Sequence, residues 1–311
     1  MSHHEPTVWL GFTALVLVLL AVDLGVLNRR AHVLSFKEAV GWSVGAIAFA
    51  MAFGLFVLLQ EGGRAALEYY TGYLVELSLS VDNLFVFILI FSYFGVPAEA
   101  RPKVLHWGIL GAIVMRFLMI ALGALLLQRF EWITWVFGGI LMFTGIRMWT
   151  QESERIEPEK NPIVRLARRV LPFSPGYDGA RFITRRSDGR RLATPLLLVL
   201  LVVEWSDLIF AIDSIPAVFA VTRDPFLVFS SNVFAILGLR ALFFVLAGMI
   251  DKFAYLKPGV ALILVFVGLK MALSAWLHIP IGLSLAVIVS TLAGAVLLSV
   301  WRAGRAADTA G

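Results

Sequence analysis

Long apolar runs follow one another along the whole chain, separated by short polar segments. Each run has roughly 20 residues, the length that a helix needs to cross about 30 Å of hydrocarbon. The pattern therefore predicts an all-α polytopic membrane protein. Nine membrane-spanning helices are expected, over residues 7–27, 39–59, 70–94, 104–127, 132–150, 194–221, 226–250, 258–277 and 281–301.

The composition agrees with a lipid-embedded chain and excludes several function classes. Of 311 residues, 60% are hydrophobic and 15% are charged, which no ordinary soluble domain shows. There is no cysteine, so disulfides and thiolate metal sites are excluded. No P-loop, G-x-S-x-G or H-E-x-x-H motif occurs, and we expect neither an enzyme nor an organic cofactor. The net charge of +5 is explained by membrane topology, so no nucleic-acid partner is expected.

The basic residues of the loops predict how the chain is oriented. With nine spans, one side of the membrane collects most loop lysines and arginines, while the other holds only Arg64, Arg129 and Arg223. The positive-inside rule then places the N-terminus outside and the C-terminus in the cytoplasm. The basic loop 151–193 is expected to be a cytoplasmic connector that touches anionic lipid, or else a docking site for a protein partner. Its stretch NPIVRLARRVLPF is compatible with a short amphipathic helix.

Spans three to five resemble spans six to eight. The matching residues, in order, are Glu76 and Asp207, Asp82 and Asp213, Asn83 and Ser214, Arg116 and Arg240, and Arg147 and Lys270. Because each unit contains three helices, the second copy enters the membrane from the opposite side, as in many transporters. The predicted organisation is two helices (1–69), repeat 1 (70–150), the loop (151–193), repeat 2 (194–277), and a last helix with a tail (278–311).

Acidic side chains inside the predicted spans are the main candidates for function, because each is unfavourable by several kcal/mol in a bilayer. Glu76 and Asp82 lie about 120° apart on an ideal helix, and Asp207 and Asp213 repeat that offset. Either each helix presents carboxylates to two neighbours, or the helix is interrupted so that both turn inward. Pro216 favours an interruption in span six.

Three interpretations of these acids remain open. They form buried ion pairs, relay protons, or bind a divalent cation with neighbouring oxygen atoms. With Asp23, six acidic residues lie in the predicted spans, against four basic residues. The excess carboxylates must therefore be neutralised by protons or by a cation. An all-oxygen site suits Mn²⁺, Mg²⁺ or Ca²⁺. The candidate ligands are Glu76, Asp82, Asn83, Glu204, Asp207, Asp213 and Ser214, and the candidate supporting residues are Ser80, Arg116, Asn232, Arg240 and Lys270.

The segments ELSLSVDN (76–83) and VEWSDLIFAIDSIPA (203–217) resemble the two signature stretches of the TerC family of integral membrane proteins. The two extra N-terminal spans resemble the Alx-like branch of that family. The resemblance implies a role in manganese homeostasis as a Mn²⁺ exporter, and in some bacteria an association with tellurite resistance. It also implies that the family's important intramembrane acids correspond to Glu76, Asp82, Glu204, Asp207 and Asp213.

The sequence therefore predicts an exporter of Mn²⁺ that works by alternating access, with protons as a candidate counter-ion and Ca²⁺ or Fe²⁺ as competing cations. The alternative is a membrane scaffold for metal or tellurite stress that does not transport and acts through the loop 151–193.

Overall fold

The computed structural model describes residues 6–27, 35–150, 161–185, 189–248, 255–277 and 279–308. For residues 23–27, 300 and 303–308 it describes the backbone alone, so the side chain of Asp23 lies outside the described part.

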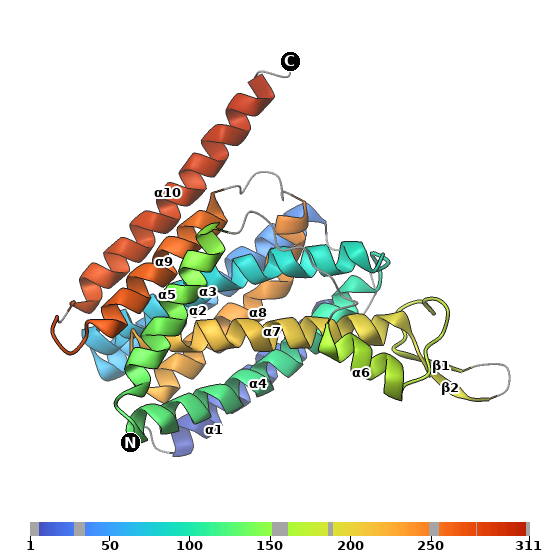
Figure 1. Cartoon of the computed structure of the whole chain (residues 1–311), viewed down its shortest axis with the longest axis horizontal. Coiled ribbons are helices and arrows are strands. Elements are labelled where there is room, and N and C mark those ends of the chain that lie inside the picture. The colour runs from blue at the N-terminus through green and yellow to red at the C-terminus, as the bar shows by residue number, and fades with distance from the viewer. Residues whose placement is uncertain are drawn as a thin grey trace.

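Nearly all of the described chain is helical (Figure 1). The helices are α1 (Pro6–Leu27), α2 (Phe36–Glu61), α3 (Gly63–Tyr93), α4 (Arg101–Arg129), α5 (Ile133–Thr150), α6 (Pro162–Val170), α7 (Pro195–Phe219), α8 (Pro225–Ala247), α9 (Leu256–Ala272) and α10 (Ile281–Asp308). The two strands are β1 (Ile183–Arg185) and β2 (Arg191–Ala193), which pair antiparallel.

Six helices of the described chain are long and apolar enough to cross a membrane. They are Phe36–Glu61, Gly63–Tyr93, Arg101–Arg129, Pro195–Phe219, Pro225–Ala247 and Ile281–Ser299. Many large apolar side chains point outward, such as Leu59 at 75% and Leu10 at 70% exposure, and an aqueous surface would not favour so many. The structure thus confirms a polytopic helical membrane protein, while the count of nine spans stays a prediction: α9 has 17 residues.

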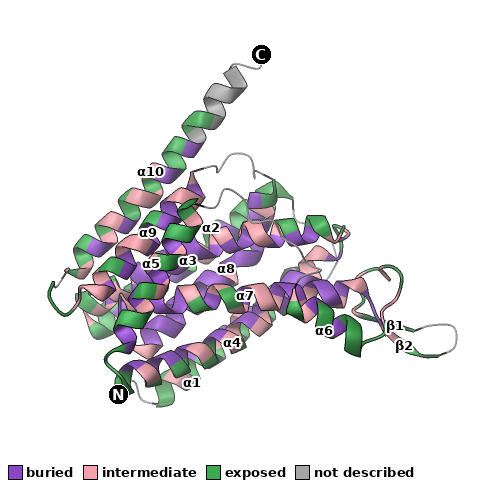
Figure 2. Cartoon of the chain, viewed as in Figure 1, coloured by how far each residue is buried: buried purple, intermediate pink, exposed green. Residues whose placement is uncertain are grey.

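The interior is built around α3 and α8, the two most buried of the six membrane-length helices (Figure 2). α3 packs against α8, α4 against α7, and α5 against α9, and α3 and α7 also meet. α10 lies beside α9 and α3, and its C-terminal part extends beyond the other helices (Figure 1). The core helices α3, α4, α7 and α8 carry the acidic residues and the two arginines of the predicted repeats.

α5 and α9 approach each other through glycines. A Cβ atom on Gly138 would lie 3.0 Å from the carbonyl oxygen of Gly268, and one on Gly268 would lie 2.8 Å from the carbonyl oxygen of Gly138. Gly145 is equally close to α9, since a Cβ there would lie 2.9 Å from the carbonyl oxygen of Ala261. Small residues at such a crossing let two backbones touch, the packing typical of membrane helices.

This close approach predicts a position-specific effect of a larger side chain. We expect Gly138→Val to lower the free energy of unfolding by about 1–3 kcal/mol, because the added atoms force α5 away from α9. Gly139→Val is the matched control, since a Cβ at Gly139 meets nothing within 4 Å. Thermal unfolding of both purified variants in the same detergent measures the difference, and equal midpoints would contradict the close crossing.

The expected amphipathic helix of the loop is confirmed as α6. Asn161 caps it, because its side-chain oxygen accepts a hydrogen bond from the backbone N–H of Ile163 at 2.9 Å. Val164 and Ala167 are buried against α7, while the basic side chains of Arg165, Arg168 and Arg169 are exposed. Residues 151–160 and 186–188 of this loop lie outside the described part.

The hairpin that follows α6 is held by side-chain hydrogen bonds and projects from one end of the molecule, beyond α6 and the start of α7 (Figure 1). Thr184 donates a 2.6 Å hydrogen bond to the carboxylate of Asp178, which holds the pKa of that carboxyl below its ordinary value. Tyr177 donates a 2.8 Å hydrogen bond to the carbonyl oxygen of Phe94 at the end of α3, and burial raises the pKa of its hydroxyl. The hairpin is therefore anchored to the helical core.

Candidate functional site

α3 and α7 run without interruption through the positions of their acidic residues. α3 is helical from Gly63 to Tyr93, and α7 contains Pro216 within its helix and continues to Phe219. The expected interruption at Pro216 is therefore wrong. Pro216 lies in the last turns of α7, where the backbone N–H that it lacks removes one hydrogen bond without ending the helix. Because both helices are regular, carboxylates six residues apart face different neighbours.

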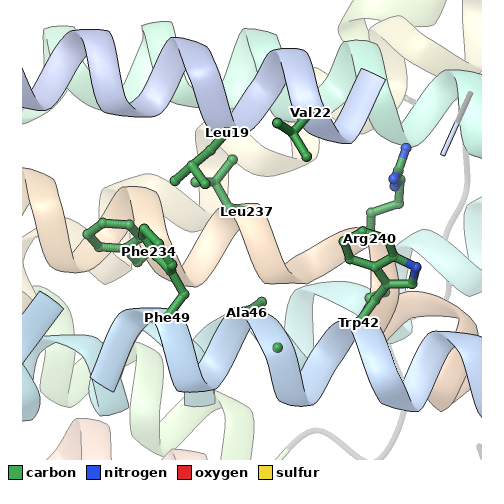
Figure 3. Close-up of a pocket in the computed structure, with 10 residues that line it drawn as sticks. Leu19, Val22, Trp42, Ala46, Phe49, Phe234, Leu237 and Arg240 are labelled. Carbon is green, nitrogen blue, oxygen red and sulfur yellow. The ribbon is translucent and has the colours of Figure 1, made fainter. Parts of the chain in front are cut away.

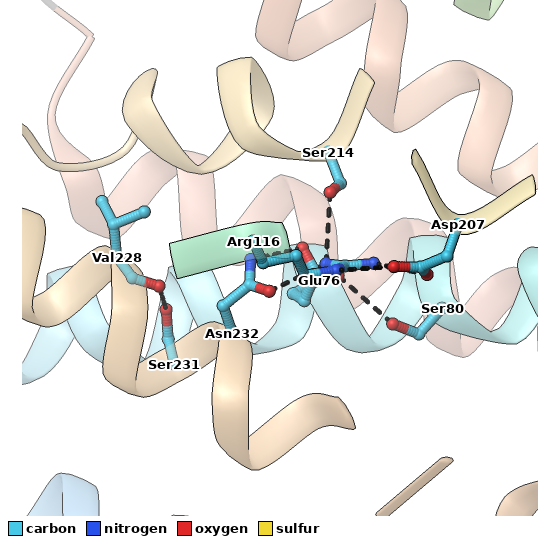
Figure 4. Close-up of polar contacts among 8 residues, drawn as sticks. All are labelled: Glu76, Ser80, Arg116, Asp207, Ser214, Val228, Ser231 and Asn232. Atoms are coloured by element: carbon cyan, nitrogen blue, oxygen red, sulfur yellow. Dashed lines mark hydrogen bonds and ion pairs between the residues drawn. The ribbon is translucent and has the colours of Figure 1, made fainter. Parts of the chain in front are cut away.

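Arg116 of α4 occupies the centre of a closed polar cluster, and its side chain is 1% exposed (Figure 4). Its guanidinium forms ion pairs with Glu76 of α3 and with Asp207 of α7, the latter at 3.3 Å between Nη2 and Oδ1. Nη1 also donates hydrogen bonds to Asn232 Oδ1 at 2.8 Å and to Ser214 Oγ at 3.3 Å. One side chain thus connects four helices, α3, α4, α7 and α8.

The carboxylate of Glu76 is the most fully bonded acid of the cluster. Ser80 Oγ donates to its Oε1 at 3.3 Å, and Asn232 Nδ2 donates to its Oε2 at 2.9 Å. All three of these residues have 0% exposure. Hydrogen bonds from neutral donors and the guanidinium together replace the water that this carboxylate has lost. For Glu76 and Asp207, the ion-pair interpretation fits the geometry, and their single basic partner leaves the cluster one negative charge in excess.

A second pair of acids, Asp82 of α3 and Asp213 of α7, lies apart from the Arg116 cluster. Both line a cavity of about 290 Å³, which we call the acid cavity. Thr144 of α5 donates a 2.8 Å hydrogen bond from its hydroxyl to Asp213 Oδ1. Arg147 of α5 and Lys257 of α9 also line the cavity, so its formal charges balance. This cavity brings together oxygen-bearing side chains from three helices.

Asn83 adds an unsatisfied amide to the acid cavity. Its side chain is 5% exposed, and among the described residues its Nδ2 has no hydrogen-bond partner. The nitrogen and oxygen of a side-chain amide are assigned by their surroundings, so the amide can equally present its oxygen at that position. A buried polar group without a partner is unfavourable by about 1–3 kcal/mol, and a ligand in the cavity would relieve this.

Glu204 is the fifth predicted acid, and it joins neither group. It lies on α7 one helical turn before Asp207, and its carboxylate packs directly against Gly111 of α4. In the described part of the chain it makes no hydrogen bond or ion pair. The five carboxylates therefore occupy three places, and among described residues no group of three or more histidine or acidic side chains is arranged to hold a metal ion.

The two predicted supporting bases of repeat 2 also lie outside the Arg116 cluster. Arg240 of α8 is 5% exposed and lies at one end of an apolar cavity of about 220 Å³ between α1, α2 and α8 (Figure 3). Lys270 of α9 lines a separate cavity of about 790 Å³, which we call the Lys270 cavity. Glu68 lines the same cavity and accepts a 2.6 Å hydrogen bond from Thr222.

Four residues of these sites were missed by sequence reasoning. Thr144 stands inside the repeat match and could have been found there, because its position is equivalent to Val267 and differs in carrying a hydroxyl. Lys257 is one of the loop lysines that the positive-inside rule counts, and nothing else in the sequence marks it as part of a site. Glu68 and Gly111 carry no signal in the sequence that points to a partner.

The fold and these sites define an integral membrane protein of several helices with ionic groups buried between its core helices. The chain belongs to the integral membrane protein TerC family, whose sequence profile matches residues 61–307. The expected family is thereby confirmed.

Similar proteins cover nearly the whole chain. An uncharacterized membrane protein of Myxococcus xanthus, STKORF319, is 50% identical over 96% of this chain and 93% of its own length. Proteins of Shigella flexneri and of Escherichia coli K12, each named as a candidate membrane-bound redox modulator, Alx, are 45% identical over 95% of both chains. No solved structure matches the chain.

Proposed function

We propose that the protein is a membrane transporter that exports divalent metal cations, with Mn²⁺ as the principal substrate, by alternating access. The observation that carries this proposal is the acid cavity, where Asp82 and Asp213 meet beside the unsatisfied amide of Asn83. Carboxylate, amide and hydroxyl oxygens are hard ligands, which Mn²⁺, Ca²⁺ and Mg²⁺ prefer. Asp82, Asp213 and Asn83 would bind the cation, and Thr144 would orient Asp213.

The basic lining of the acid cavity fits a site that is occupied only transiently. Arg147 and Lys257 balance the two carboxylates while no metal is bound. A divalent cation in the cavity would be repelled by these two positive charges, which weakens its binding and favours its release. A transport site needs such moderate affinity, whereas a storage site does not.

The packing of the helices supports an inverted repeat. If α3, α4 and α5 correspond to α7, α8 and α9, the α3–α8 contact corresponds to the α7–α4 contact, and both occur. The α5–α9 crossing shows the same relation in detail. Extending the sequence match without gaps pairs Gly138 with Ala261, Met142 with Val265, and Gly145 with Gly268. A Cβ on Gly145 would meet Ala261 and Val265. A Cβ on Gly268 would meet Gly138 and Met142, which are the residues equivalent to those two.

The two polar cavities also correspond under this exchange of repeats. Arg147, Met148 and Lys257 line the acid cavity. Their equivalents Lys270, Met271 and Thr134 line the Lys270 cavity. Transporters with inverted repeats open such equivalent cavities alternately to the two sides of the membrane. Here the acid cavity would be the entrance on one side and the Lys270 cavity the exit on the other.

The orientation follows from the distribution of charge along the chain. Arg64 and Arg223, two of the three basic residues assigned to the outer side, line the Lys270 cavity. The acid cavity, lined by Lys257, then faces the cytoplasm, as an exporter requires for loading. The proposed location is a bacterial inner membrane, with the N-terminus outside and the C-terminus in the cytoplasm.

Transport by the purified full-length chain in liposomes tests the proposal. We expect saturable, time-dependent accumulation of radioactive Mn²⁺ above that of liposomes without protein, and an imposed pH gradient should change its rate if protons are the counter-ion. Adding Ca²⁺ or Fe²⁺ in excess measures competition. The absence of accumulation with and without a gradient would contradict the exporter.

A scaffold that acts through the loop 151–193 is the second candidate function. It is favoured by the exposed arginines of α6 and by the projecting hairpin (Figure 1). The Alx relatives named as redox modulators also suggest an indirect effect on redox state, and this chain has no cysteine with which to exchange thiols. Normal Mn²⁺ tolerance of cells in which residues 162–193 are replaced by a short flexible linker would exclude the scaffold.

A further inference from the structure

The carboxyl group of Glu204 lies at the interface between α7 and α4, where it packs against a glycine of α4. Its side chain is half-buried, and a Cβ atom on Gly111 would overlap its carboxylate, so a side chain at that position of α4 would displace the carboxyl group. By contrast, a Cβ on Gly108, one turn away on α4, would lie at an ordinary 3.4 Å from Val203. The glycine at 111 is thus specifically matched to Glu204.

The flank of α4 against which Glu204 packs carries large apolar side chains that are exposed. Trp107 is 50% exposed and Val114 is 61% exposed on the flank of α4 that contains Gly111. Glu204 lines neither the acid cavity nor the Lys270 cavity. It therefore cannot share a cation with Asp82 and Asp213 in this conformation.

No base neutralises Glu204 within the described part of the chain. The acidic, basic and histidine side chains on elements that pack against α7 are Arg64, Glu68, Glu76 and Asp82 of α3, Arg101, Lys103, His106, Arg116 and Arg129 of α4, Arg147 of α5, Arg165, Arg168 and Arg169 of α6, Arg240 of α8, Lys257 and Lys270 of α9, and Arg191 of β2. None of them forms a hydrogen bond or ion pair with Glu204. The charged group that acts on it is Asp207, which carries the same sign.

An ionised carboxyl in such a place is strongly unfavourable, because it has lost water and gained no partner. Binding a proton removes the charge and needs no further group. We propose that Glu204 is a proton-binding site of this protein, separate from the cation site, and that it carries a proton in the conformation described here.

The position of Glu204 links its proton to the helix arrangement. Asp207, one turn away, shares the guanidinium of Arg116 with Glu76. Losing the proton would place a third negative charge beside a cluster that already has two carboxylates for one guanidinium. Proton release would therefore disturb the contacts that join α3, α4, α7 and α8. If the protein transports cations as proposed above, Glu204 is the group that couples this transport to protons, and that statement depends on the proposed function.

Reaction with N,N′-dicyclohexylcarbodiimide tests the protonated state directly. A protonated carboxyl passes its proton to one nitrogen of the reagent, and its oxygen bonds to the central carbon. The adduct then rearranges to a stable N-acylurea that retains the whole reagent. We expect mass spectrometry of the purified full chain to find this adduct on Glu204 and not on Glu76 or Asp207, and Glu204→Gln to remove it.

The pH dependence and two matched variants make the test specific. The labelling rate should fall on the order of tenfold per pH unit once the carboxyl ionises. Gly111→Ala should raise the rate severalfold, since the methyl group displaces the carboxyl toward the open lipid side, and Gly108→Ala should leave it unchanged. An unlabelled Glu204, or a rate independent of pH, would overturn the proposal. Because no metal is used, this result is independent of whether Mn²⁺ is transported.

Discussion

Replacing Arg116 by methionine is expected to lower the free energy of unfolding by about 3–5 kcal/mol, because it leaves two buried carboxylates without a base. The substitution keeps most of the side-chain volume and removes the only base paired with Glu76 and Asp207 among the described residues. Asn232 and Ser214 lose their donor as well. The loss of stability is measured as the shift of the unfolding midpoint in mild detergent, with the fraction of protein that stays monodisperse as the readout of unfolding.

Two controls separate buried charge from the mere loss of an arginine. Arg64 also pairs with an acid, Glu68 at 3.2 Å, but its side chain is 87% exposed, so Arg64→Met should change stability by about 0.5 kcal/mol or less. Adding Glu76→Gln and Asp207→Asn to Arg116→Met removes the uncompensated charges and should restore much of the lost stability. If Arg116→Met and Arg64→Met have the same effect, Arg116 does not hold the core together.

The positions of the helices were largely predictable, because apolar runs of bilayer length dictate where a chain must be helical. The sequence also indicated that Arg116 lies among acids. How the acids divide into groups was not predictable. Asp82 and Glu76 differ only by a rotation of about 120° along one helix, and which neighbour each one meets depends on how α4, α5 and α8 are placed. An interruption at Pro216 would have turned both acids of α7 inward, but α7 is continuous there.

Arg116 and Arg240 occupy equivalent positions in the proposed repeats but have different partners, because one neighbouring residue differs between the two repeats. Under the proposed match, the position of Asn232 on α8 corresponds to Gly108 on α4. Asn232 completes the bonding of Glu76 and Arg116, whereas a glycine offers Asp207 and Arg240 no such donor. Asp207 and Arg240 instead line a small cavity of about 20 Å³ that Gly108 also lines. Equivalent positions therefore do not imply equivalent chemistry.

Neutralising either acid of the acid cavity is expected to lower the initial rate of Mn²⁺ accumulation in liposomes at least on the order of tenfold, since changes near metal ligands commonly have effects of that size. Asp82→Asn and Asp213→Asn each remove an anionic oxygen and leave Arg147 and Lys257 in place. The formal charge of the cavity then changes from neutral to +1, which repels a divalent cation. Asn is nearly isosteric with Asp, so the fold should persist.

Thr144→Val distinguishes ligand chemistry from cavity shape. Valine keeps the volume of threonine and removes the hydroxyl that donates to Asp213, so transport should weaken less than in Asp213→Asn. Asp178→Asn makes the same chemical change outside the helical core and should transport Mn²⁺ at the rate of the unaltered chain. Stabilisation by Mn²⁺ in thermal unfolding should be lost with Asp82→Asn and Asp213→Asn and kept with Asp178→Asn. If both cavity variants still transport Mn²⁺ normally, the cation crosses elsewhere, and these two carboxylates serve only to pair with the bases beside them.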